Sequence, residues 1–266
     1  MTEITKNKKF DALLDEIKQI SGLIWESGWA EANAGNFSVN ATEIFKGGKY
    51  SFSGKRVKTS GEYKFLRNNF IVISRAGSRM RDISINPISD ICILYIDKTG
   101  KGYYSISTGG EKDIKPTSEL LTHLEIQNKL VKNNPEEKAV LHTHPAELIA
   151  LTNLKKFTSG KNINKLFYSV LPELSVLFPD GIGFVKCFDA GSEELALQTG
   201  RKFRKKKIVL WEKHGCVSAG RNLSEAFDRI DVMVKSAKIF FLAASTGNKT
   251  NGLNVHQIKE LKNHSK

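Results

Sequence analysis

The chain has 266 residues, 40% of them hydrophobic, which is enough for a substantial core, and we expect one domain over residues 1–266 with a polar tail from about residue 247. No apolar run reaches the roughly 18 residues of a membrane span, no secretion signal opens the chain and its three cysteines are scattered, so we expect a cytoplasmic protein with reduced thiols and no membrane contact. The formal charge of +13 could indicate nucleic-acid binding, but the densest basic run, residues 201–207, closes a helical pattern where cations are favourable, and we expect no nucleic-acid partner.

The first part of the chain combines a helix with a polar turn. Residues 10–25 place apolar side chains at helical spacing and predict an amphipathic helix. In the following segment, residues 29–40, Asn33 and Asn36 lie on either side of Gly35 before an alternating, strand-like pattern begins. Such a turn can offer backbone N–H groups and side-chain amides to an anion, although asparagine and glycine are also ordinary turn residues.

A set of strands follows. Residues 41–68 are polar and rich in lysine and glycine, which indicates an excursion or an irregular hairpin. Residues 70–74 predict a strand, and the turn over residues 75–81 carries three arginines, so it is either a second anion-contacting turn or a surface loop. Residues 91–96 and 103–108 predict two strands joined by a hairpin turn.

The segment around Glu119 predicts the start of a helix. Thr117 or Ser118 can cap this helix, and Glu119 is favourable in its first turn, which is an adequate structural explanation of the pattern. A functional alternative is that the two hydroxyls and the helix N-terminus hold a phosphate, while Glu119 faces a metal as acid or base. Spacing alone favours the structural interpretation.

Two histidines end the next apolar strand pattern. Residues 139–145 read Ala-Val-Leu-His-Thr-His-Pro, so His142 and His144 point to the same face of an extended chain and can share one ion. His214, at the end of another apolar run, is a candidate third ligand. Three neutral imidazoles suit zinc and leave a position open for substrate. We interpret the remaining histidines as surface residues: His123, His256 and His264.

Four further elements complete the chain. They are a short helix over residues 146–153, an apolar segment over 166–177, an amphipathic helix over 192–200, and a long helix over 223–242 that begins at a cap residue, Asn222 or Ser224.

Several sequence blocks occur in a fixed order between about residues 20 and 245. They are Gly28-Trp-Ala-Glu-Ala-Asn-Ala-Gly-Asn-Phe-Ser38, Pro116-Thr-Ser-Glu119, His142-Thr-His-Pro145, Phe178-Pro-Asp-Gly181, Leu210-Trp-Glu-Lys-His-Gly215 and Glu225-Ala-Phe-Asp-Arg-Ile-Asp231. In this order the chain resembles the class II, zinc-dependent sugar-phosphate aldolases of the aldolase/adducin superfamily. The fourth and sixth blocks favour the rhamnulose-phosphate branch over the shorter fuculose and ribulose relatives.

This resemblance implies both a fold and a metal site. The fold would be an α/β fold of three layers, α/β/α, with a central mixed, largely antiparallel sheet, assembled as a homotetramer with active sites at subunit interfaces. One Zn²⁺ per subunit would be bound by His142, His144 and His214. Glu119 would be the catalytic acid and base, and Glu173 would reach into the neighbouring subunit's site as a second proton-transfer group.

The resemblance also implies a set of contacts to the phosphate or neighbouring oxygens of a phosphorylated ketose: Asn33, Gly35, Asn36, Gly77 and Ser118. This chain departs from the family in one turn, where Gly-Ser-Gly is usual and residues 75–77 read Arg-Ala-Gly. The hydroxyl donor is therefore absent or displaced to Ser74 or Ser78, and Arg75 is a candidate charged replacement.

The reaction implied by the resemblance is reversible cleavage of L-rhamnulose 1-phosphate to dihydroxyacetone phosphate and L-lactaldehyde. Zinc would act as a Lewis acid for the negative charge that develops when the C3–C4 bond breaks. Two alternatives stay open: an aldolase, epimerase or dehydratase acting on another sugar phosphate, and a non-catalytic adducin-like binding module. Retention of the three histidines and Glu119 argues against the binding module.

Overall fold

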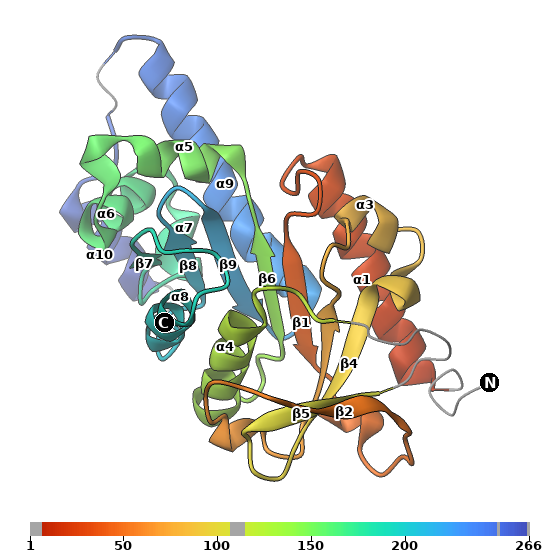
Figure 1. Cartoon of the computed structure of the whole chain (residues 1–266). Helices are drawn as coiled ribbons and strands as arrows, with labels where there is room; N and C mark the ends of the chain where they lie inside the picture. The colour runs from red at the N-terminus through yellow and green to blue at the C-terminus, as the bar shows by residue number, and fades with distance from the viewer. Residues whose placement is uncertain (1–6, 107–114, 249–250, 265–266) are drawn as a thin grey trace.

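The computed structural model describes residues 7–106, 115–248 and 251–264, and the strands within them form one sheet. These strands are β1 (Asn36–Asn40), β2 (Phe52–Lys58), β3 (Phe70–Ser74), β4 (Ile91–Ile96), β5 (Gly102–Ile106), β6 (Ala139–Thr143), β7 (Gly183–Val185), β8 (Ile208–Trp211) and β9 (Gly215–Gly220). Their order across the sheet is β2-β5-β4-β3-β1-β6-β9-β8-β7 (Figure 1). Neighbouring strands are antiparallel except β7 and β8, so the predicted mixed, largely antiparallel sheet is confirmed.

The α-helices of the described segments cover both faces of the sheet (Figure 1). They are α1 (Lys8–Glu26), α2 (Thr42–Phe45), α3 (Met80–Ile83), α4 (Leu120–Asn133), α5 (Ala146–Asn153), α6 (Gly160–Val170), α7 (Glu173–Leu177), α8 (Glu193–Lys202), α9 (Leu223–Ser245) and α10 (Val255–His264). Among these described helices, none combines the length and the apolar character needed to cross a membrane.

Alternation along the strands divides the core into two layers. In β6, Leu141 packs in the cluster shared with α1, α5 and α9, whereas its neighbour Val140 packs in the cluster shared with α4 and α8. In β8, Leu210 and Val209 divide in the same way. Because successive strand residues point to opposite faces, each central strand is buried on both sides. The predicted three-layer α/β/α architecture is therefore confirmed.

Side-chain caps begin several of the predicted helices. Asn222 accepts a hydrogen bond from the backbone N–H of Glu225 (2.8 Å), which resolves the choice between Asn222 and Ser224 as the cap of α9. Ser192 caps α8 in the same way. Arg201 and Lys202 lie in the last turn of α8, where cations suit the helix dipole, as expected for the basic run.

Two segments differ from the sequence interpretation. The polar stretch 41–68 contains β2, which does not pair within that stretch but joins β5 through a bulged register as a strand at the edge of the sheet. The polar segment from residue 247 contains α10, which packs against α7, and the N–H of Leu253 donates to the carbonyl of Ser169 (2.9 Å).

Candidate active site

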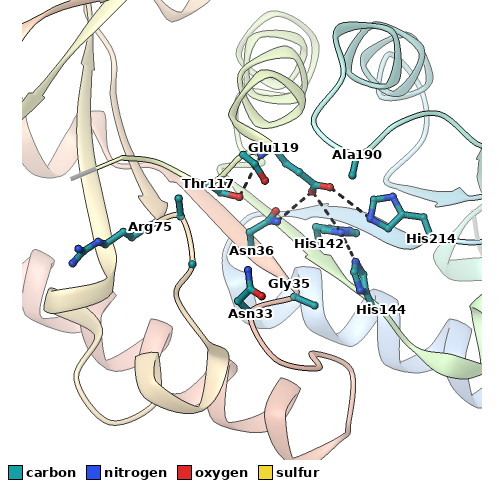
Figure 2. Close-up of a pocket in the computed structure, with 14 residues that line it drawn as sticks. Asn33, Gly35, Asn36, Arg75, Thr117, Glu119, His142, His144, Ala190 and His214 are labelled. Carbon is teal, nitrogen blue, oxygen red and sulfur yellow. Dashed lines mark hydrogen bonds and ion pairs between the residues drawn. The ribbon is translucent and has the colours of Figure 1, made fainter. Parts of the chain in front are cut away.

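The structure brings the three predicted ligand histidines together near the end of β6 (Figure 2). His142 lies in β6, His144 follows the strand, and His214 lies in the turn between β8 and β9. One side-chain nitrogen from each lies within 4.8 Å of the others, and the Nε2 atoms of His142 and His144 are 3.0 Å apart. Three imidazoles from two distant parts of the chain therefore face one point.

The pairing of β6 with β9 explains this convergence. The antiparallel register places Thr143 opposite Cys216, so the end of β6 lies beside the start of β9. A side chain at Gly215 would collide with the carbonyl oxygen of Thr143 and crowd the ring of His144, so only glycine permits this approach. The backbone N–H of His144 also donates to the carbonyl of Trp29 (2.8 Å).

Hydrogen bonds and burial set the chemical state of these rings. The Nδ1–H of His142 donates to the carbonyl of Cys216 (2.8 Å). Nε2 therefore carries no hydrogen, and its lone pair is available to a metal ion. The Nδ1 of His144 lies 2.9 Å from a carboxylate oxygen of Glu31. Burial lowers the pKa of His142 well below its ordinary value and that of His214 to about 4, so both rings are neutral at pH 7. Neutral imidazole is the form that binds metal ions.

Glu119 lies beside the histidines as the N-cap residue of α4. Its side chain is buried, with Oε2 3.5 Å from Nε2 of His142 and Oε1 3.6 Å from Nε2 of His214. Burial raises the pKa of Glu119 to about 7, against the opposing effect of the hydrogen bond that Asn36 donates to Oε2 (3.2 Å). A carboxyl group with this pKa can both release and accept a proton near neutral pH.

The prediction that Thr117 or Ser118 caps this helix with Glu119 in its first turn is wrong, because Glu119 is itself the N-cap residue of α4 and its side chain makes no capping hydrogen bond. The hydroxyl oxygen of Thr117 accepts the backbone N–H of Glu119 (3.4 Å), and the carbonyl of Thr117 accepts the N–H of Leu120 (3.1 Å). Thr117 thus supports the helix start, while Ser118 is exposed and lines the cavity.

A cavity of about 170 Å³ adjoins the histidines and Glu119. Its lining includes every residue that the resemblance assigns to the substrate end: Asn33, Gly35, Asn36, Gly77 and Ser118. Both glycines have φ near 79°, in the left-handed region that glycine favours. A Cβ at Gly35 would also lie 3.3 Å from the carbonyl oxygen of His142, so this turn approaches the histidine strand closely.

The variant turn at residues 75–77 lines the cavity without supplying a charged side chain to it. The guanidinium of Arg75 points away from the histidines (Figure 2) and donates to the carbonyl of Ser89 (3.3 Å). The hydroxyl of Ser74 accepts a backbone N–H, and that of Ser78 donates to a backbone carbonyl. Neither Ser74 nor Ser78 is among the residues that line the cavity.

Glu173 lies away from this cavity within its own chain. It is exposed at the first position of α7 and is not among the residues that line the cavity. Ala190, by contrast, lines the cavity near His214 (Figure 2). It could not be predicted, because a methyl group carries no chemical signal.

The prediction that His123 is a surface residue is wrong. Its side chain is 1% exposed, and its Nε2 lies 2.6 Å from Oδ1 of Asn36. The spacing of four residues between Glu119 and His123 was a usable signal, since residues four apart share one helix face. His256 is exposed, as expected, whereas the side chain of His264 lies outside the described part of the chain.

Comparison with known proteins gives concordant matches over most of the chain. A family model for the class II aldolase and adducin N-terminal domain matches residues 15–241. A rhamnulose-1-phosphate aldolase of Bacteroides thetaiotaomicron is 32% identical over 255 residues, 93% of this chain and 92% of the relative. A rhamnulose-1-phosphate aldolase of Listeria welshimeri is 29% identical over 237 residues, 87% of this chain and 83% of the relative. The crystal structure of a sugar-phosphate aldolase from Thermotoga maritima is similar with a TM-score of 0.78 and 34% identity, covering 92% of this chain and 100% of that one.

Proposed function

The chain belongs to the class II aldolase and adducin family, and we propose that it catalyses the reversible cleavage of L-rhamnulose 1-phosphate to dihydroxyacetone phosphate and L-lactaldehyde. The observation that carries this proposal is the buried Glu119 beside three converging histidines in one cavity. The names of the relatives that match over most of the chain favour this substrate over other ketose phosphates.

The donor set fits a divalent cation, and we propose one Zn²⁺ per subunit held by His142, His144 and His214. Imidazole nitrogen is a ligand that zinc favours, and three protein ligands leave a position for substrate, as in catalytic zinc sites. Burial keeps His142 and His214 neutral, and the Nδ1–H bond of His142 directs its other nitrogen toward the shared point. When bound, the cation would supply a Lewis acid for the negative charge that develops on the ketose oxygens.

Glu119 is the proposed acid and base at carbon. When the C3–C4 bond breaks, its electron pair stays with C3, and the carboxyl group of Glu119 gives its proton to that carbon. In the condensation direction the carboxylate takes the same proton back. A pKa near 7, caused by burial, suits a group that must work in both directions.

A second proton-transfer group is required at the aldehyde end, because the C4 hydroxyl must lose its proton as C4 becomes the aldehyde carbon. We propose that Glu173 of a neighbouring subunit has this role in a homotetramer with active sites at subunit interfaces. The exposed position of Glu173 outside its own cavity supports a contact with another subunit.

The phosphate end of the substrate is proposed to lie among the turns that contain Gly35 and Gly77. Their left-handed backbone can present N–H groups to an anion, and Asn33 and Ser118 add polar side chains at the cavity wall. Figure 2 shows Arg75, which begins the turn that contains Gly77, and His214 on opposite sides of Asn36. A phosphate bound there would therefore leave the ketose carbons near the histidines.

The decisive experiment couples metal analysis to an assay of dihydroxyacetone phosphate release on a panel of ketose phosphates. We expect cleavage of L-rhamnulose 1-phosphate, loss of cleavage on chelation, and loss of cleavage in Glu119→Gln with the metal retained. Preferential cleavage of another ketose phosphate would change the substrate but not the reaction. Binding without cleavage of any of them would favour the adducin-like module instead.

A further inference from the structure

A buried histidine that the proposed reaction does not use lies directly behind Glu119. His123 is one turn further along α4, so both residues face β1. Both ring nitrogens of His123 are engaged, Nε2 with Oδ1 of Asn36 (2.6 Å) and Nδ1 with the hydroxyl of Ser38 (2.9 Å). Asn36 and Ser38 are two residues apart and therefore lie on the same face of β1.

The chemistry of the partners fixes the direction of each hydrogen bond. An amide oxygen only accepts, so Nε2 of His123 carries a hydrogen and donates it to Asn36. Burial lowers the pKa of His123 to about 3, so the ring is neutral and its Nδ1 must accept from the hydroxyl of Ser38. The oxygen of Ser38 in turn accepts from Nε2 of Gln127 (3.1 Å). All these side chains are buried, so water does not offer competing partners.

This series of hydrogen bonds determines which end of the Asn36 amide faces Glu119. With Oδ1 held by His123, the NH₂ group points to Glu119 and donates to Oε2 (3.2 Å). Without His123, the amide is free to turn over and place its oxygen against the carboxyl group. When Glu119 is ionised, two acceptors would then face each other, and the carboxylate would lose the donor that holds its position.

We propose that His123 is a positioning residue that acts through Asn36 to hold the carboxyl group of Glu119 in line with the three histidines. The inference rests on the proposed function, in which Glu119 transfers the proton at C3. It adds a residue that lies behind the cavity wall and acts through Asn36.

The test compares His123→Leu with His123→Gln in the metal-loaded protein. Leucine has no donor, whereas glutamine can place an N–H near the position of Nε2 of the imidazole. We expect kcat for L-rhamnulose 1-phosphate to fall by about 10-fold or more in His123→Leu, with KM changed less than about threefold, and to recover largely in His123→Gln. Both variants should bind as much metal as the wild type.

A double-mutant cycle separates positioning from a general structural effect. In an Asn36→Ala background, His123→Leu should have little further effect on kcat, because the residue through which it acts on Glu119 is already gone. Fully additive losses, or a change in KM alone, would overturn the proposal. A wild type that cleaves none of the ketose phosphates would refute the proposed function itself, a result that the cycle cannot imitate.

A measurement on the wild type covers the outcome in which His123→Leu does not fold. The ¹⁵N chemical shifts of the His123 ring should show a neutral imidazole with the hydrogen on Nε2 between about pH 5 and pH 8. A hydrogen on Nδ1 instead would mean that Asn36 is not held by this ring, and would overturn the proposal.

Discussion

At the scale of single residues, Glu119 couples the proposed chemistry to stability. Burial raises its pKa from 4.5 to about 7 in the folded chain. Unfolding therefore releases a proton between these pH values, and the free energy of unfolding contributed by this group falls as pH rises through the window. We therefore compare the free energies of unfolding of metal-free Glu119→Gln and of the metal-free wild type. We expect their difference to shift by about 3 kcal/mol in favour of Glu119→Gln when the pH is raised from 4 to 8. Urea unfolding of both proteins at the two pH values measures this difference.

The other titrating groups are common to both proteins, so their effects cancel in that comparison. Buried neutral histidines such as His123 and His142 destabilise both proteins as the pH falls below their ordinary pKa. An equal free-energy difference between the two proteins at pH 4 and pH 8 would show that the carboxyl group of Glu119 is not buried as described.

Glu31 is a residue whose effect should be confined to metal affinity. Its carboxylate lies 2.9 Å from Nδ1 of His144 and orients that ring, although its side chain is 69% exposed. Mutation of a hydrogen-bond partner of a metal-binding histidine typically weakens metal affinity by about 10–100-fold. We expect Glu31→Gln to weaken zinc binding in that range when measured by competition with a chelator. Glu26→Gln, which removes an exposed carboxylate at the end of α1, is the matched control and should leave the affinity unchanged.

At the scale of secondary-structure elements, the approach of β9 to the end of β6 depends on one glycine. A Cβ at Gly215 would meet the Thr143 carbonyl and the ring of His144, so Gly215→Ala must push the two strands apart. We expect a loss of about 1–3 kcal/mol in the free energy of unfolding together with weaker zinc binding. Gly22→Ala is the control, because its new methyl group would lie 3.6 Å from Ser84 in ordinary contact. Loss of stability with unchanged zinc affinity would show that this strand contact does not set the position of the histidines.

Periodicity in the sequence predicted the helices and strands better than it predicted which strands pair with each other. The long helices, the strands at 70–74 and 91–96 and the helix at 146–153 have clear local patterns, and the structure contains each of them. The pairing of β2 with β5 was not predictable, because it joins segments far apart in the chain and the polar composition of residues 41–68 hides the strand. The helix α10 was missed for a similar reason: it is polar over most of its length.

The same distinction applies to the site. The spacing of His142 and His144 indicates a shared ion directly, since alternate strand residues share a face. The four-residue spacing on the helix shows only that His123 shares a face with Glu119. To predict its contacts with Asn36 and Ser38, which are two residues apart on the strand, one must also know that α4 lies over β1. The orientation of Arg75 depends on a carbonyl fourteen residues later in the chain, which no local pattern encodes.

At the scale of the whole molecule, the proposed sharing of active sites between subunits can be tested by complementation. Glu119→Gln and Glu173→Gln should each be inactive alone. If Glu173 acts in a neighbouring subunit's site, mixed oligomers contain sites with both native carboxylates, and random mixing in equal amounts should restore about a quarter of the wild-type activity. Mass spectrometry under native conditions checks that mixed tetramers have formed. Mixed tetramers with no recovered activity would contradict the sharing of a site between subunits, and full activity of Glu173→Gln alone would place Glu173 outside the reaction.

The most direct measurement is the metal content of the purified protein together with its cleavage activity before and after chelation. We expect one zinc per chain, release of dihydroxyacetone phosphate from L-rhamnulose 1-phosphate, loss of this activity when the metal is removed, and its return when zinc is added back. Replacing His142, His144 or His214 by alanine should abolish both the bound metal and the cleavage. Full cleavage by protein that has been stripped of metal would contradict the central claim that these three imidazoles hold the ion on which the reaction depends.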